Sequence, residues 1–383
     1  YRNEITKVII DTTAAPSERG QVTEIGSYAF SELKNLKEVT LTEGITRIGD
    51  YAFQGCKSLP ELVLPESVTD IGKGAFQGCD SMTQITIPNA TDNGKGILTE
   101  IKEDTFLGCA KLQTIKRKKA SGYSPVLTYD KDYTFSTVTR VGTRAFKGCA
   151  ALTAIKLPKV ETIDAEAFYN CSSLGTVELP EDGSVKKFQT IGESVFKNCK
   201  ALKKIDIPWT VTSIGAEAFS GTGLNTIRIP EQVVVIGDGA FSNITGGNTD
   251  VTFTVNSSIE NNTHTHRIFG VEVFGRSELR NVVFEPCTDV IENGWFDNCS
   301  FQTMTIPASV TTIAPNAFTN CTGVTAFVVK PENRDYKAPG GILFSYDLTK
   351  LIRYPVNKDG ASYTVPNHVN EIAANAFYKS GKL

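Results

Sequence analysis

Cysteine is the residue type in this chain whose number and spacing could do chemistry, because nine occur in 383 residues. A thiol can form a disulfide, hold a metal ion or act as a nucleophile, and each role needs a suitably placed partner. No Cys-x-x-Cys pair is present, and eight of the nine follow a phenylalanine by three residues. This spacing predicts a column of reduced, buried thiols that act as small apolar side chains. The eight are Cys56, Cys79, Cys109, Cys149, Cys171, Cys199, Cys299 and Cys321, while Cys287 lies elsewhere.

The three histidines offer little for metal or acid–base chemistry. His264 and His266 lie two residues apart, so on an extended segment they would share a face and could supply two metal ligands. No further Cys or pair of His lies nearby in sequence, and a polar loop is the favoured interpretation; His368 has no evident partner. The sequence lacks a G-x-S-x-G motif, a phosphate loop and an H-E-x-x-H motif. We therefore predict no enzyme activity, no catalytic residue, no cofactor and no metal site.

The composition excludes further classes of function. Lys plus Arg number 39 and Asp plus Glu number 42, which gives a net charge of −3. Nucleic-acid binding and polybasic membrane attachment both need a large positive excess, so neither is predicted. No apolar run approaches the 18 residues of a membrane span, and no signal peptide is visible at the first residues. Hydrophobic residues make up 40%, which is enough for a packed core.

A repeat must position all of these side chains. A phenylalanine, usually after alanine, recurs thirteen times, and seven of the twelve intervals are 22 or 23 residues. An Ile or a substitute lies five residues before each Phe, and a stretch of the form Leu-x-x-Ile-x-Ile-Pro follows. The phenylalanines are Phe30, Phe53, Phe76, Phe106, Phe146, Phe168, Phe196, Phe219, Phe241, Phe274, Phe296, Phe318 and Phe377.

Each part of the repeat has a structural interpretation. The alternating Ile-x-Ile predicts a short half-buried strand, and the proline ends it. The Val-x-x-Ile-Gly segment predicts a second short extended segment, and Ala-Phe-x-x-Cys-x-x-Leu has the apolar spacing of a single helical or 3₁₀ turn. One such unit cannot bury its own apolar face, so neighbours must stack. We predict an α/β repeat solenoid of about 13 coils, with a parallel β-sheet and short helical turns, as a single domain over residues 1–383. Phe53, Phe76, Phe146, Phe168, Phe196 and Phe219 should form one buried ladder.

These columns resemble the BspA-like, or Treponema pallidum-type, leucine-rich repeat. Copies such as Leu152-x-x-Ile155-x-Leu157-Pro158 carry the resemblance, which extends from about Ile5 to Phe377. The segment from Gly341 to Pro355 is similar to a hairpin-like insertion common in that family. The resemblance implies a right-handed leucine-rich-repeat coil, and a secreted or cell-surface bacterial protein associated with adhesion. It implies no catalytic site.

Five insertions interrupt the repeat, near 89–99, 117–137, 181–189, 243–270 and 331–362. Lengthening a loop costs little entropy, so each could be a tolerated surface excursion, although insertions can also build a binding rim. The insertion at 117–137 carries several aromatic residues, which suggests packing on the solenoid edge or contact with a partner. No polar cap is evident at either end, and we therefore expect a fragment of a longer chain.

Two functions remain open. The first is a non-enzymatic extracellular binding or adhesion module for a host or microbial surface protein or glycan, and the alternative is a structural spacer that presents another domain. In each strand the residue between the last two apolar positions points away from the core. The charged part of this outward column is explained by cross-strand pairing in a solvated face, and our hypothesis is that it is also the partner-binding surface. The predicted residues are Lys116, Lys156, Glu178, Asp206 and Arg228.

Overall fold

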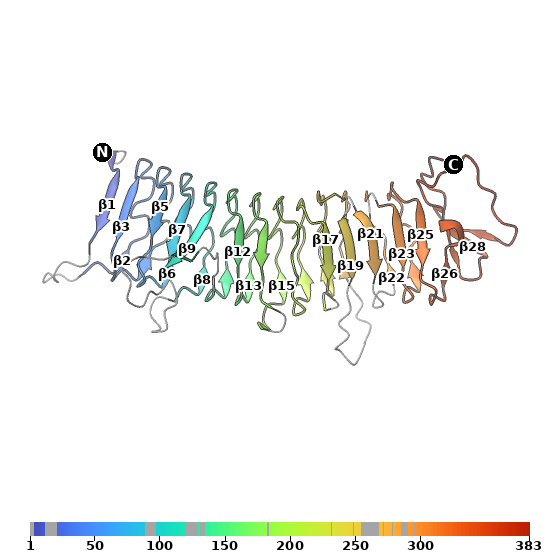
Figure 1. Cartoon of the computed structure of the whole chain (residues 1–383), viewed down its shortest axis with the longest axis horizontal. Coiled ribbons are helices and arrows are strands. Elements are labelled where there is room, and N and C mark those ends of the chain that lie inside the picture. Colours follow the sequence, from blue (N-terminus) through green and yellow to red (C-terminus); the bar gives the residue numbers. More distant parts are fainter. Residues whose placement is uncertain are drawn as a thin grey trace. The chain divides into compact units, whose positions relative to one another are not determined.

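A computed structural model of the chain divides into two compact units, Tyr1–Leu202 and Lys203–Leu383, which are described in turn (Figure 1). It describes all residues except 1–3, 12–20, 89–96, 119–128, 131–134, 182–183, 231, 248, 254–267, 271, 278, 285–289, 295, 297 and 300. His264, His266 and Cys287 therefore lie outside the described residues, as do most of the insertions at 89–99, 117–137 and 243–270.

Each repeat of the first unit contributes one longer strand and one two-residue strand, and like strands pair in parallel. The longer strands are β1 (Lys7–Ile10), β3 (Glu38–Leu41), β5 (Glu61–Val63), β7 (Gln84–Ile87), β9 (Thr114–Lys118), β12 (Ala154–Lys156) and β14 (Thr176–Glu178). The short strands are β2 (Glu24–Ile25), β4 (Arg47–Ile48), β6 (Asp70–Ile71), β8 (Glu100–Ile101), β11 (Arg140–Val141), β13 (Thr162–Ile163) and β15 (Thr190–Ile191). An antiparallel pair interrupts this pattern where β10 (Tyr129–Asp130) joins β9.

The second unit repeats the plan. Its longer strands form a five-stranded parallel sheet of β17 (Thr226–Ile229), β19 (Thr249–Phe253), β21 (Leu279–Phe284), β23 (Thr303–Ile306) and β25 (Ala326–Val329). Its short strands are β16 (Ser213–Ile214), β18 (Val235–Ile236), β20 (Ile268–Phe269), β22 (Val290–Ile291) and β24 (Thr312–Ile313). The last part contains β26 (Tyr336–Lys337), the 3₁₀ helix η2 (Pro339–Gly341), β27 (Leu343–Ser345), β28 (Lys350–Arg353) and β29 (Glu371–Ile372). The solenoid with a parallel sheet is confirmed.

The Ala-Phe segment is a series of turns with hydrogen bonds between residues three apart, which agrees with the expected spacing of a 3₁₀ turn, but the segment is not continued into a helix. No α-helix occurs among the described residues. The residues two before and two after Phe53, Tyr51 and Gly55, have φ of 55° and 69°, and the same two positions have positive φ in most coils. A left-handed residue every four positions stops a helix from propagating. The apolar spacing of three residues corresponds to hydrogen bonds between residues three apart in sequence, for example from Cys56 N to Phe53 O at 3.2 Å.

These turns form a third hydrogen-bonded ladder, beside the two ladders of strands. Tyr51 N donates to Lys73 O, Phe53 N to Ala75 O and Gly55 N to Gln77 O, each at 2.8 Å. Corresponding bonds recur in the following coils, such as Phe146 N to Ala167 O at 2.8 Å. Every side of a coil is thus bonded to the next coil through its backbone, which leaves few buried peptide groups without partners.

The core of each unit contains a column of stacked phenylalanine rings. Neighbouring centroids lie 5.2–5.7 Å apart between consecutive rings from Phe30 to Phe196, and 5.1–6.3 Å apart from Phe219 to Phe318. The six rings that the sequence assigns to a buried ladder are all 0% exposed, so their predicted burial is confirmed.

Candidate functional site

The cysteine column is buried, and each of its eight thiols donates a hydrogen bond to the phenylalanine carbonyl of the preceding coil. Cys171 Sγ, for example, lies 3.1 Å from Phe146 O. Where Ser277 replaces the cysteine, its Oγ makes the same bond to Phe241 O at 2.7 Å. The column therefore has a polar role besides its apolar one, because each S–H satisfies a carbonyl in the core.

Burial favours the neutral form of several of these thiols. Desolvation raises the pKa of Cys56 to about 12, and it raises the pKa of Cys171 and Cys199 well above the ordinary value. A thiol that does not ionise is a poor nucleophile and a poor metal ligand. No group of three His, Cys, Asp or Glu placed to hold a metal ion occurs within the part of the chain that the structure describes.

The residues predicted for the partner-binding surface fall into both units. In the first unit, Lys156 on β12 and Glu178 on β14 are paired in register, and their side chains form an ion pair of 3.1 Å. Lys116 lies on β9, in register with Thr86. In the second unit, Asp206 forms an ion pair of 3.0 Å with Lys204, two residues before it in a segment that forms no strand, and Arg228 is exposed on β17. The structure thus brings one predicted pair into contact, through the cross-strand pairing that would also explain a solvated face.

The insertion near 117–137 contributes one aromatic anchor within the described residues. Phe135 is 2% exposed, and its ring lies 6.2 Å from that of Phe146 in the core ladder, at a tilt of 58°. The predicted packing of aromatic residues from this insertion on the solenoid is confirmed for Phe135. Tyr123 and Tyr133 lie outside the described residues.

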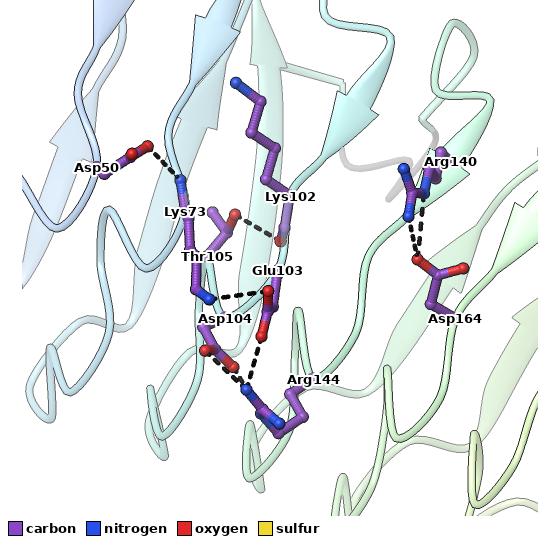
Figure 2. Close-up of polar contacts among 9 residues, drawn as sticks. All are labelled: Asp50, Lys73, Lys102, Glu103, Asp104, Thr105, Arg140, Arg144 and Asp164. Carbon is purple, nitrogen blue, oxygen red and sulfur yellow. Dashed lines mark hydrogen bonds and ion pairs between the residues drawn. The ribbon is translucent and has the colours of Figure 1, made fainter.

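A second charged surface, along the short strands of the first unit, was not predicted from the sequence. The residues directly before the repeat isoleucine face one another in register: Glu24, Arg47 and Asp70 in one sheet, and Glu100 and Arg140 in the next. Arg140 binds Asp164 at 2.8 Å and Glu100 at 3.4 Å, and Figure 2 shows its guanidinium directed at Asp164. The sign of the charge at this one repeat position, read coil by coil, is the signal that would have revealed the column.

The adjoining turns extend this ion-pair network. Arg144 binds Glu103 and Asp104, each at 2.8 Å, and Lys73 binds the other oxygen of Glu103 at 2.9 Å (Figure 2). The side chain of Asp50 accepts a bond of 2.9 Å from Lys73 N. The hydrogen bond to Asp104 is the main reason that the pKa of Arg144 is raised. Acidic and basic groups neutralise one another here, so the network joins neighbouring coils and presents little net charge.

A pocket lies in the second unit, where a hairpin interrupts the repeat. Its volume is about 480 Å³, and its walls include Ile313, Pro315 and Phe318 from one coil and Ala373 from the last. β27 and β28 pair in antiparallel fashion, which confirms the hairpin expected near 341–355. The polar side chains that line the pocket are Tyr336, Ser345, Lys350, Arg353 and Glu371.

Comparison with known proteins agrees with this architecture. The sequence model of the BspA type leucine rich repeat region matches residues 13–123, 131–248 and 252–339. A leucine-rich repeat protein from Bacteroides ovatus has a TM-score of 0.56 and 22% identity, over 99% of this chain and 85% of that one. A leucine rich cell surface protein from Faecalibacterium prausnitzii has a TM-score of 0.43 and 21% identity, over 98% and 80%. The T. pallidum leucine rich repeat protein has a TM-score of 0.40 and 25% identity, over 52% and 78%.

No curated protein matches the chain. Among the described segments, none forms a helix with the length and apolar character needed to cross a bilayer.

Proposed function

The chain belongs to the family of BspA-type leucine-rich repeat proteins, and from that premise we propose that it is a non-enzymatic binding module. It acts outside the bacterial cell, secreted or at the surface, and recognises a protein or glycan of a host or of another microbe. The family supports this location and role. Nucleic acid is not a partner, because a chain with a net charge of −3 would not attract it.

The observation that carries this proposal is the outward face of the longer strands. In the first unit, Ile9 is 59% exposed and Val63 is 39% exposed, each at the outward position of its strand. Exposed apolar side chains give a partner surface to bury, and charges on the same face can select and orient that partner. The backbone beneath them is held by ladders of hydrogen bonds, so little conformational entropy is lost when a partner binds. Lys116, Lys156 and Glu178 are the proposed contact residues here, and Asp206 and Arg228 are those of the second unit.

The ion pair between Lys156 and Glu178 allows a test that separates recognition from stability. Lys156→Glu breaks the pair and reverses one charge, whereas Lys156→Glu with Glu178→Lys restores a pair with its charges exchanged. If a partner reads these charges, both variants should bind about tenfold more weakly or worse, while the double variant keeps the melting temperature of the wild type. Binding is measured by flow cytometry, with labelled protein on epithelial cells and on a panel of bacteria.

The same test extends to the second unit by reversal of Lys156, Asp206 and Arg228 together. Loss of binding in this triple variant but not in Lys156→Glu would place the contacts on the second unit. Unchanged binding in every variant would contradict the proposed face and move the site to the insertions or to the opposite side of the coils.

The alternative function is a spacer that presents another domain and has no ligand of its own. The ion-pair network of the first unit favours this alternative, because its charges pair with one another between coils and leave little unpaired charge for a partner to contact. A spacer predicts no saturable binding to any of the cells, whereas a binding module predicts saturation that an excess of unlabelled protein abolishes.

A further inference from the structure

The hairpin of the second unit breaks the regular ladders, and side chains take the place of the missing backbone partners. Ile313 N donates to the hydroxyl oxygen of Tyr336 at 3.1 Å, and that hydroxyl donates to Thr311 O at 3.1 Å. The carbonyl of Phe318 accepts from Arg353 Nη2 at 3.1 Å, where the regular coils use a cysteine thiol. The pocket therefore lies beside a strand edge that no neighbouring backbone strand covers along the described residues.

Arg353 is a buried cation whose charge is not balanced by the residues described. It is 4% exposed, and its hydrogen-bond acceptors are the carbonyl oxygens of Phe318, Asn375 and Tyr378. Carbonyl oxygens satisfy N–H groups but carry no net charge. Among the described residues, no carboxylate lies within ion-pair distance of this guanidinium, and burial lowers its pKa. A buried charge without a counter-ion is costly unless something completes it.

Two of the N–H donors of this guanidinium, Nε–H and one Nη1–H, have no acceptor among the described residues. An arginine side chain has five N–H donors, and the three bonds above use Nη1 and Nη2. Nε has no acceptor among the described residues. It is not one of the fully buried polar atoms without a partner in that part of the chain, so it keeps some exposed surface. Arg353 lines the pocket, so a ligand bound there would lie beside its side chain.

The rest of the pocket defines the shape and polarity of a ligand. The walls are largely apolar, with Ile313, Phe318, Ile352 and Ala373 among them. Lys350 at the pocket is already balanced by Glu371, with which it forms an ion pair of 2.6 Å. A volume of about 480 Å³ lies in the range of small-molecule sites. One unbalanced cation in a cavity with seven apolar residues among its twelve lining residues suits one carboxylate on an apolar body, whereas a phosphate would need several more donors.

We propose that this pocket binds a small monocarboxylate with an apolar body, the carboxylate paired with Arg353 and the body against Ile313, Phe318 and Ala373. This site is separate from the outward face of the longer strands, and it does not depend on the function proposed for that face. Its ligand is a small molecule, so the chain would carry a second binding activity.

The test measures binding of hexanoate and of benzoate to the full chain by isothermal titration calorimetry, with hexanamide and benzamide as uncharged counterparts of the same shape. At least one acid should bind saturably, and about tenfold or more tightly than its amide, because the charge-assisted bond to Arg353 is lost in the amide. Equal affinity of each acid and its amide, or no saturable binding of either acid, would overturn the proposal.

Two variants locate the site. Ala373→Leu fills the cavity without touching the bonds of Arg353, and it should weaken binding of the acid about tenfold or more. Ala165→Leu, at a half-buried alanine of the first unit, is the matched control and should bind as the wild type does. Arg353→Met keeps the apolar stem and should remove the preference for acid over amide. If Arg353→Met fails to fold, Ala373→Leu decides: binding as tight as in the wild type would refute the site.

Discussion

At the residue scale, the cysteine of this repeat is a hydrogen-bond donor as well as a small apolar side chain. The spacing of the eight cysteines predicted their burial, and that part is confirmed. The bond from each thiol to a phenylalanine carbonyl was not predicted, because a column of cysteines has the same spacing whether or not its S–H groups donate. The single serine in the same role, Ser277, would have been the signal.

The donor role predicts an order of stability among variants of Cys171. Cys171→Ala removes the donor to Phe146 O and leaves a buried carbonyl with one partner fewer, so the free energy of unfolding should fall by about 1–3 kcal/mol. Cys171→Ser keeps a hydrogen-bond donor, as Ser277 does in its own coil, so its free energy of unfolding should fall by less than that of Cys171→Ala. Urea unfolding measures both, with the exposed Ser173→Ala as control. A serine variant less stable than the alanine variant would show that the carbonyl needs no donor.

The raised pKa of the thiols predicts how stability depends on pH. The folded state holds the neutral thiol of Cys56, with a pKa of about 12, whereas the unfolded chain releases that proton near its ordinary value of 9.0. The folded state therefore binds more protons above pH 9, and this contribution to stability is complete below pH 9 and is lost as the pH rises to 12. At pH 10 it should already be reduced by about 1 kcal/mol for each such thiol.

The measurement is urea unfolding at pH 8, 9 and 10, on the wild type and on Cys56→Ser. The serine variant should lose less stability between pH 8 and 10 than the wild type. Identical losses in the two proteins would mean that this thiol ionises as readily in the folded state as in the unfolded chain.

At the element scale, the glycine after the repeat isoleucine is set by the distance between neighbouring coils. A Cβ built on Gly72 would lie 2.5 Å from Asp50 N. One built on Gly26, at the same place in an earlier repeat, would have no atom of the described residues within 4 Å of it. Gly72→Ala should therefore destabilise the chain by about 1–3 kcal/mol through overpacking. Gly26→Ala is the matched control and should be neutral or slightly stabilising. Thermal unfolding of the two variants checks this, and equal melting temperatures would contradict the close approach.

The elements also show where prediction from sequence succeeds and where it stops. The longer strands, their ends at proline and the phenylalanine ladder can be predicted from the sequence, because apolar residues mark the same buried positions in every coil. The turn ladder could not be predicted in this way. Its left-handed positions are occupied by Tyr51, Asp104, Arg144 and Glu166 as well as by glycine, so no single residue type marks the conformation.

The pocket beside the hairpin was beyond prediction for a related reason. It depends on which side chains reach across the interval of 59 residues from Phe318 to Phe377, which contains the insertion, and no repeat position encodes that. The ion-pair network of the first unit, in contrast, could have been found. Part of it occupies the one repeat position before the isoleucine, where acidic and basic residues are paired in register within each sheet: Glu24, Arg47, Asp70, Glu100 and Arg140.

At the scale of the whole molecule, we propose that residues 1–383 are a single solenoid domain, as the sequence predicts. In repeat proteins, stability is close to a sum of nearest-neighbour terms, so coils that stack without interruption unfold together. A single transition in urea, with the same midpoint by circular dichroism and by tyrosine fluorescence, is the expected outcome. Two separate transitions, one of which a fragment of residues 1–202 reproduces, would show that the two compact units are independent domains.

The third hydrogen-bonded ladder has a mechanical consequence. Within each unit its bonds run from one coil to the next, as the strand ladders do, so a tensile force along the stacking direction pulls on these bonds end to end. Bonds loaded in this direction open one coil at a time, as in unzipping, and not all together, as in shear. A repeat of 22–23 residues would then extend by on the order of 70 Å when it leaves the stack. Each unit should therefore lengthen under load in steps of one coil.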